Sequence, residues 1–125
     1  LDTHCWLWWI AEPGRLSPTT LSLLKSPDTT VLFSAVSTWE IAIKYSIGKL
    51  KLPEPPESFV PSRLERDRID SLPIQHAHTL KIATLPHYHR DPFDRLLIAQ
   101  AIVEGVPIVT ADSAFRRYEV ELMRA

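Results

Sequence analysis

Carboxylate side chains recur in this sequence next to the ends of expected strands. Asp2 ends the first expected strand, Glu40 lies in the first turn after the second, and Asp112 directly follows a third. In sheets built from parallel strands, binding sites form beyond the carboxyl ends of the strands. Asp94 opens the helix that leads into that third strand, and it joins the others if this helix start abuts the same edge. We therefore expect Asp2, Glu40, Asp94 and Asp112 to converge.

A divalent cation would explain such a convergence. Four carboxylates about 5 Å apart repel by about 3 kcal/mol per pair at an effective dielectric near 20. Protonation of one carboxylate would relieve part of this repulsion, and a divalent cation would relieve more. Hard oxygen ligands without cysteine suit Mg²⁺ or Mn²⁺ rather than Zn²⁺. Carboxylate-held Mg²⁺ can lower the pKa of a bound water and stabilise the transition state of phosphodiester hydrolysis.

Each acid also has a purely structural interpretation. Ser37 and Glu40 match the S-x-x-E pattern of a helix capping box. Asp91 and Asp112 have the positions of helix N-caps, and Asp94 suits the dipole of the helix that begins at Asp91. Capping is the commoner role for any one of these residues, whereas the four together favour a metal. We assign Asp91 to the cap.

Strands alternate with helices along the chain, and these elements must position the acids. Buried strands are expected at 31–35 and 107–110, a more exposed one at 69–74, and an edge strand at 118–123. Helices are expected at 5–11, from Ser17 as N-cap, from Ser37 to Gly48, at 75–84 and at 91–104, with another possible at 57–65. This order predicts an α/β fold with a central parallel sheet flanked by helices. The residues before Cys5 resemble the end of a strand whose beginning is missing, so we expect a slightly longer natural N-terminus.

The bulk composition excludes several classes of protein. The 125 residues suit one domain, and 45% hydrophobic with 23% charged residues are ordinary globular values. A formal net charge of -1 excludes a strongly basic nucleic-acid footprint over the whole chain. Cys5 is the only cysteine, so no intrachain disulfide forms, which fits a reducing cytoplasm. No apolar run approaches the roughly 20 residues of a membrane span, and no signal peptide is visible.

Four segments together resemble a known family. They are LDTH at the start, SAVSTWEIAIK, HRDPFDRLLIAQA and PIVTADSAF. They are similar to the PIN-domain nucleases, and most closely to the VapC-type toxins of VapBC toxin–antitoxin pairs. The resemblance covers essentially the whole chain and implies a three-layer PIN-like domain over residues 1–125. It implies a Mg²⁺- or Mn²⁺-dependent ribonuclease, a cytoplasmic homodimer, and a VapB-like antitoxin whose C-terminal segment blocks the active site.

The family pattern assigns the acidic site to Asp2, Glu40, Asp94 and Asp112, with Asp91 outside it. The implied mechanism is hydrolysis of RNA by a metal-activated water, which leaves a 5′-phosphate and a 3′-hydroxyl. Ser113 is one departure, because other members often have a charged residue there.

Three further residues are candidates for the same site. Thr3 and Thr110 are placed to hydrogen-bond either to ligand carboxylates or to phosphate, and Arg95 to contact a substrate phosphate or an antitoxin carboxylate. For Arg95 a solvated position on the helix face is an equal alternative.

Other signals fit more ordinary explanations. His87, His89 and Asp91 alternate as a zinc trio would, yet solvated loop histidines are the commoner case and no cysteine supports zinc. Lys44, Lys49 and Lys51 would suit an RNA path, although a solvated face is the default for lysines. A different class of function, a catalytically silent PIN fold that binds RNA or protein, also remains open.

Overall fold

The computed structural model describes residues 1–88, 90–118 and 120–125, and describes Arg117 by its backbone alone. The α-helices are α1 (Thr3–Ala11), α2 (Pro18–Lys25), α3 (Ala35–Ser46), α4 (Pro56–Arg66), α5 (His76–Lys81) and α6 (Pro92–Glu104). The strands are β1 (Leu32–Ser34), β2 (Asp70–Leu72), β3 (Ile108–Thr110) and β4 (Leu122–Arg124). Short 3₁₀ turns complete the order: η1 (Pro13–Arg15), η2 (Ile82–Thr84) and η3 (Ser113–Arg117).

The four described strands form two separate parallel pairs. β1 pairs with β2, and β3 pairs with β4, both in parallel register. The prediction of parallel pairing is confirmed, and the predicted central sheet is present as two strand pairs. Of the expected edge strand at 118–123, the structure forms only the end, and Glu119 lies outside the described residues.

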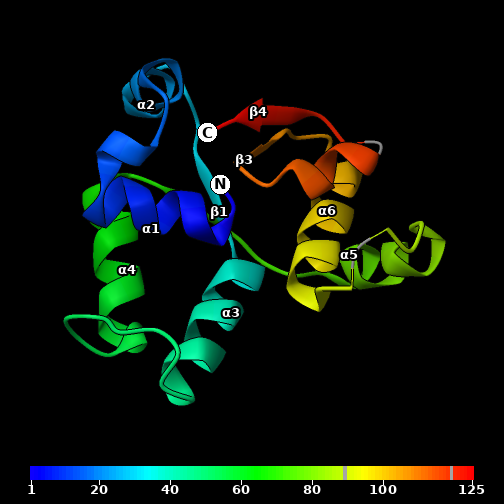
Figure 1. Ribbon diagram of the computed structural model, residues 1–125, viewed down its shortest axis with the longest axis horizontal. Helices are drawn as coiled ribbons and strands as arrows, with labels where there is room; N and C mark the ends of the chain where they lie inside the picture. The colour runs from blue at the N-terminus through cyan, green and yellow to red at the C-terminus, as the bar shows by residue number, and fades with distance from the viewer. Residues whose placement is uncertain (89, 119) are drawn as a thin grey trace.

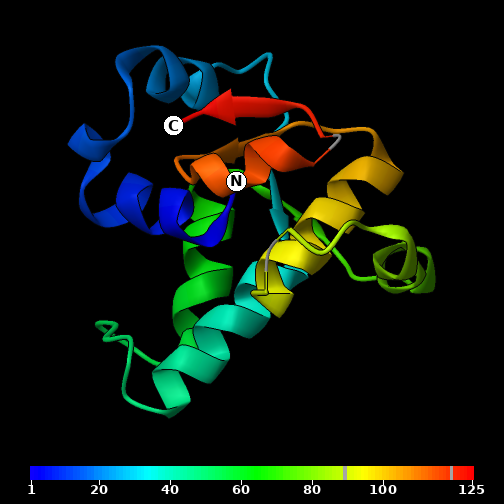
Figure 2. The same ribbon diagram turned by 45° about the vertical axis from the view of Figure 1, so that its right-hand side comes forward.

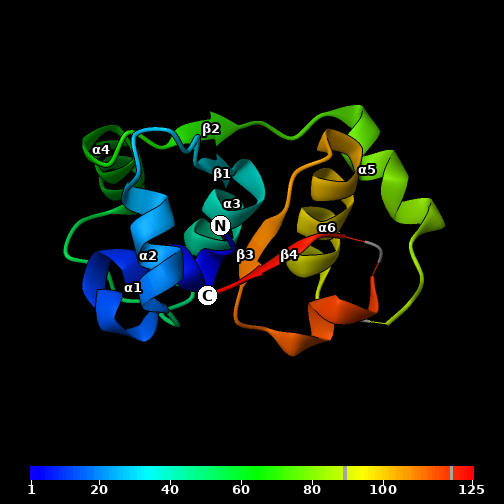
Figure 3. The ribbon, with the colours of Figure 1, turned by 90° about the horizontal axis from the view of Figure 1, so that it is seen from above.

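The first two residues bridge the two strand pairs. The Leu1 amine donates to the Leu32 carbonyl at 3.3 Å, and the Asp2 N–H donates to the Val109 carbonyl at 2.9 Å. Figure 3 shows the N-terminus between β1 and β3. α1 begins at Thr3, two residues earlier than expected.

Helices cover the strands on two sides. α1, α2 and α4 lie on one side, and α5 and α6 on the other (Figures 1 and 2). The first side has a core in which the Trp6 ring packs on Phe33 and Phe59, with centroids 4.4 and 5.9 Å apart. The second core surrounds α6 and includes the buried Ile98 and Phe115. Among the described helices, none is long and apolar enough to cross a membrane.

The beginning and end of α6 agree closely with the sequence prediction. Asp91 is the N-cap, and its Oδ1 accepts from the N–H groups of Phe93 at 2.8 Å and Asp94 at 3.2 Å. Pro92 occupies the first helical position, where a missing N–H costs nothing. Gly105 ends the helix at φ 67°, a left-handed conformation that favours glycine. The apolar body of α6 is buried, so the helix start is held firmly against the rest of the domain.

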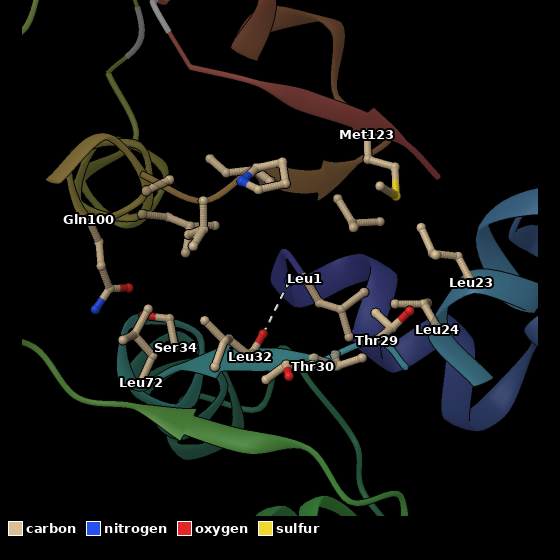
Figure 4. Close-up of a pocket in the computed structure, with 17 residues that line it drawn as sticks. Leu1, Leu23, Leu24, Thr29, Thr30, Leu32, Ser34, Leu72, Gln100 and Met123 are labelled. Carbon is tan, nitrogen blue, oxygen red and sulfur yellow. Dashed lines mark hydrogen bonds between the residues drawn. The ribbon is translucent and has the colours of Figure 1, made fainter. Parts of the chain in front are cut away.

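An apolar cavity of about 180 Å³ lies beside Leu1, between β1 and β3 (Figure 4). Its lining includes Leu24, Ile108 and Met123, together with the amide of Gln100 from α6. Within the described part of the chain, Gln100 Oε1 has no hydrogen-bond partner. None of the lining residues is an acid, so this cavity is separate from the carboxylates.

Candidate active site

Asp2 is a buried carboxylate with a partner on each oxygen. It caps α1, where Oδ1 accepts from the Cys5 N–H at 2.8 Å, and its side chain is 7% exposed overall. Oδ2 accepts from the Thr110 hydroxyl at 2.5 Å. The Thr110 hydroxyl in turn accepts from the Asp112 N–H at 3.0 Å. Thr110, at the end of β3, therefore connects the start of the chain to the turn that carries Asp112.

Glu40 is the second buried carboxylate, and it is 5% exposed. The Thr3 hydroxyl donates to Oε1 at 2.6 Å, and the Lys44 ammonium lies 2.5 Å from Oε2. Lys44 is one helical turn beyond Glu40, which is the spacing at which side chains on a helix meet. Thr3 follows Asp2 directly, so α1 brings the two buried acids into one neighbourhood. Of the two contacts expected for Thr3 and Thr110, the structure shows the one to carboxylates.

The predicted capping box of Ser37 and Glu40 is wrong. α3 begins at Ala35 with Ser34 as its N-cap, and the Ser34 hydroxyl accepts from the Val36 N–H at 3.0 Å. Ser37 therefore lies inside the helix, and within the described part of the chain its buried hydroxyl has no hydrogen-bond partner. Because Glu40 falls in the second turn, capping does not explain its burial. The structure therefore excludes the capping role for Glu40.

Asp94 lies in the first turn of α6, where it is half-buried. The residues before Asp94 and Glu40 are in contact: the rings of Phe93 and Trp39 pack edge to face, with centroids 4.6 Å apart. This contact joins α3 and α6 at the level of both acids.

Asp112 is exposed and caps η3, because its Oδ1 accepts from the Ala114 N–H at 2.9 Å. The capping interpretation is thus confirmed for both Asp91 and Asp112. Among the described residues, no three His, Cys, Asp and Glu side chains gather closely enough to hold a metal ion. The structure brings Asp2 and Glu40 into one neighbourhood through Thr3, which follows Asp2 and binds Glu40, and it connects the Asp112 backbone to Asp2 through Thr110.

The donor set nonetheless fits a hard divalent cation. Asp2 and Glu40 offer buried anionic oxygens, and the ammonium beside Glu40 Oε2 shows that this position accepts a positive charge. Mg²⁺ is commonly held by one or two carboxylates and several waters. Burial and the adjacent Asp2 raise the pKa of the Cys5 thiol, which disfavours it as a thiolate ligand.

The sequence matches the PIN domain over residues 1–121. The chain belongs to the PIN-domain family. Ribonuclease VapC22 of Mycobacterium tuberculosis is 31% identical over 118 residues, which span 94% of this chain and 89% of that protein. Ribonuclease VapC16 of the same organism is 45% identical over 60 residues, but the match spans only 48% of this chain and 43% of that protein.

A solved structure has the same fold as this PIN domain. It is VapBC2 from Rickettsia felis bound to a DNA fragment from their promoter. The TM-score is 0.75 at 21% identity, and the match covers 98% of this chain and 95% of that one. The α/β architecture expected from the sequence is therefore confirmed as a PIN fold.

Arg95 has a different position in this PIN domain from the one expected. Its side chain is buried, and it donates to the carbonyl oxygens of Pro86 at 2.8 Å and Ile82 at 3.5 Å. These contacts tie the segment after α5 to the first turns of α6. A solvated helix-face position is excluded by the burial. A phosphate contact would require the guanidinium to leave both carbonyls, so the structure does not favour it.

Proposed function

We propose that this PIN domain is a metal-dependent endoribonuclease that acts as the toxin of a type II toxin–antitoxin pair. The observation that carries the proposal is the pair of buried carboxylates, Asp2 and Glu40, each oriented by a threonine hydroxyl. Buried acids with fixed oxygens are costly unless they hold cations, and a nuclease site has that requirement. The 31% identity to a protein named a ribonuclease, over 94% of the chain, supports the same activity.

The chain's own residues have distinct roles in this proposal. Asp2 and Glu40 hold the ion, and Asp94 and Asp112 complete its surroundings from the starts of α6 and η3. Thr3 and Thr110 each fix one carboxylate oxygen, so the remaining lone pairs point in a defined direction. When bound, Mg²⁺ or Mn²⁺ supplies Lewis-acid stabilisation of the phosphoryl oxygens and activates water for attack.

Cleavage of RNA tests this activity. Purified protein should cut RNA with Mg²⁺ or Mn²⁺, leave 5′-phosphate ends, and lose activity in EDTA. Glu40→Gln keeps the shape of the side chain and removes its charge, so it should abolish cleavage. Glu57→Gln, on the exposed surface of α4, is the matched control and should retain full activity. Titration with each ion separately identifies the preferred one.

A catalytically silent PIN fold that binds RNA or protein is the second candidate. It is favoured by one observation, namely that no three described acids, histidines or cysteines gather as a metal site. RNA binding without cleavage, in either metal and at all protein concentrations, would select this candidate over the nuclease.

The partners follow from the same proposal. A VapB-like antitoxin should co-purify with the chain and relieve the growth arrest that its cytoplasmic expression causes, and the fold match to a VapBC complex supports such a partner. We further propose that residues 1–125 act as one domain and associate as a homodimer. Trp39, Ile43 and Ile47 form an exposed apolar stripe along α3, which supports association. Light scattering at two protein concentrations measures the mass of the assembly.

A further inference from the structure

A second cavity lies at the carboxyl ends of β3 and β4, and its volume is about 210 Å³. Its lining comprises Thr110, Ala111, Asp112, Ser113, Arg116, Leu122 and Arg124. One part of this lining is acidic and belongs to the candidate active site. The other part is basic and consists of Arg116 and Arg124, which have no role in the reaction proposed above.

Arg124 enters this cavity from β4. In the parallel register, Arg124 is the partner of Thr110, the residue whose hydroxyl binds Asp2. Paired residues on neighbouring strands point to the same face, and neighbouring strands lie about 4.8 Å apart. The exposed side chain of Arg124 therefore begins immediately beside the acidic site.

Arg116 enters from η3, the turn that Asp112 caps and that follows β3 in Figure 3. Its side chain is exposed, as that of Arg124 is. Within the described part of the chain, neither guanidinium pairs with a carboxylate or stacks on a ring. By contrast, Arg15, Arg63 and Arg66 each have an acidic partner. Two uncompensated cations lining one cavity create a site for an anion.

We propose that Arg116 and Arg124 bind a backbone phosphate of the RNA strand adjacent to the scissile phosphate. This inference rests on the proposed ribonuclease function. Guanidinium groups match phosphate oxygens in planar, two-point hydrogen bonding. A strand that presents one phosphate to Asp2 and Glu40 presents a neighbouring phosphate next to them. Thr110 and Asp112 of the acidic site line the same cavity as the two arginines. One RNA strand can therefore contact the acids and the arginines together.

Fluorescence anisotropy of a labelled single-stranded RNA in EDTA tests binding without cleavage. Arg116→Gln and Arg124→Gln should each weaken binding by about three- to tenfold, as expected for a partly exposed charged hydrogen bond. The double variant should lower the slope of log K against log salt by about 0.7, the contribution of one phosphate contact on a single strand. In cleavage assays KM should rise while kcat changes little. Arg116→Lys and Arg124→Lys should keep the salt slope, because the charge remains. They should lose part of the affinity, because lysine lacks the two-point hydrogen bonding of arginine.

Arg68→Gln is the matched control, because Arg68 is exposed and precedes β2, at the opposite end of the strands. It should leave RNA affinity and salt slope unchanged. An unchanged affinity and slope in the folded double glutamine variant, with wild-type cleavage intact, would overturn this inference and leave the nuclease standing. The inference would also be overturned if the double glutamine variant lost binding to a polyglutamate peptide but retained its binding to RNA. Wild-type protein that neither binds nor cuts RNA would refute the proposed function itself.

Discussion

Thr110 donates a hydrogen bond to Asp2 across 108 residues of sequence, and this contact joins the beginning of the chain to β3. Both residues are buried, and the oxygen to hydroxyl-oxygen distance is 2.5 Å. The same hydroxyl accepts from the Asp112 backbone. One threonine therefore positions an acid from the first residues and a turn from the last third of the chain.

Thr110→Val should weaken both folding and catalysis. Valine keeps the shape of threonine but leaves Asp2 Oδ2 without its donor, which costs about 1–3 kcal/mol of unfolding free energy. RNA cleavage should fall by about 10- to 100-fold, the range found when a residue orienting a metal ligand is removed. Urea unfolding and a cleavage assay measure the two effects. Thr110→Ser, which retains the hydroxyl, should recover most of both, and a serine variant as impaired as the valine variant would argue against the hydrogen bond.

Lys44→Met should raise the affinity for divalent cations. In the metal-free protein the Lys44 ammonium already occupies Oε2 of Glu40, so an arriving ion must displace it. Removing this competitor should tighten Mn²⁺ binding by about three- to tenfold, because more of the protein is then competent to bind. The metal-free protein should lose about 0.5–1 kcal/mol of stability, since Lys44 is partly exposed.

Calorimetric titration with Mn²⁺ and thermal unfolding in EDTA measure these opposite changes. Lys49→Met, at an exposed lysine beyond the end of α3, is the control. Equal Mn²⁺ affinity in the Lys44 variant and the wild type would mean that the ion does not use this oxygen of Glu40.

Mutation of Asp91 should affect mainly stability, whereas mutation of Asp94 should affect mainly RNA cleavage. Asp91→Ala removes the acceptor for two N–H groups at the start of α6 and should cost about 1 kcal/mol of stability, with cleavage retained at temperatures where the protein stays folded. Asp94→Asn should leave stability nearly unchanged and reduce cleavage by at least about 100-fold, since a metal ligand contributes several kcal/mol to transition-state stabilisation. Asp28→Asn, in an exposed turn, controls for the loss of charge. Full activity in Asp94→Asn would remove Asp94 from the site.

Cys5 should give the protein an alkaline stability limit. Burial and the neighbouring Asp2 raise the pKa of its thiol, so the folded chain keeps the proton that the unfolded chain releases above about pH 9. The folded state then binds more protons than the unfolded state, and stability falls as pH rises, by up to about 1.4 kcal/mol per pH unit. Cys5→Ala should be less stable at pH 7, and its deficit should shrink between pH 9 and pH 10.5 in urea unfolding. A deficit that stays constant over this range would contradict the assignment.

Local signals predicted α6 well because several of them agree there. Asp91 and Pro92 fix the start, Gly105 fixes the end, and the apolar run between them leaves no competing register. The start of α3 was missed because Ser34 and Ser37 are both acceptable caps, and sequence alone does not rank them. In the structure Ser34 is the N-cap, so Glu40 lies in the second turn rather than at a capping position.

Long-range pairing accounts for most of the remaining differences. The sequence predicted parallel strands, and both strand pairs are parallel. The division of the strands into two pairs depends on contacts between distant segments, which the local sequence pattern does not specify. Arg124 was missed for the same reason, because only the β3–β4 register places it beside Thr110. The spacing of Glu40 and Lys44 did carry a signal for their ion pair.

The bridge made by Leu1 and Asp2 has a consequence for how the domain can open. Asp2 contacts β3 twice, through its N–H to the Val109 carbonyl and through its side chain to the Thr110 hydroxyl. Leu1 contacts β1 at the Leu32 carbonyl. A local opening that releases these contacts separates the two strand pairs and frees the Asp2 carboxylate in the same event. Loss of the site and loss of the central contact of the domain should therefore occur in one transition.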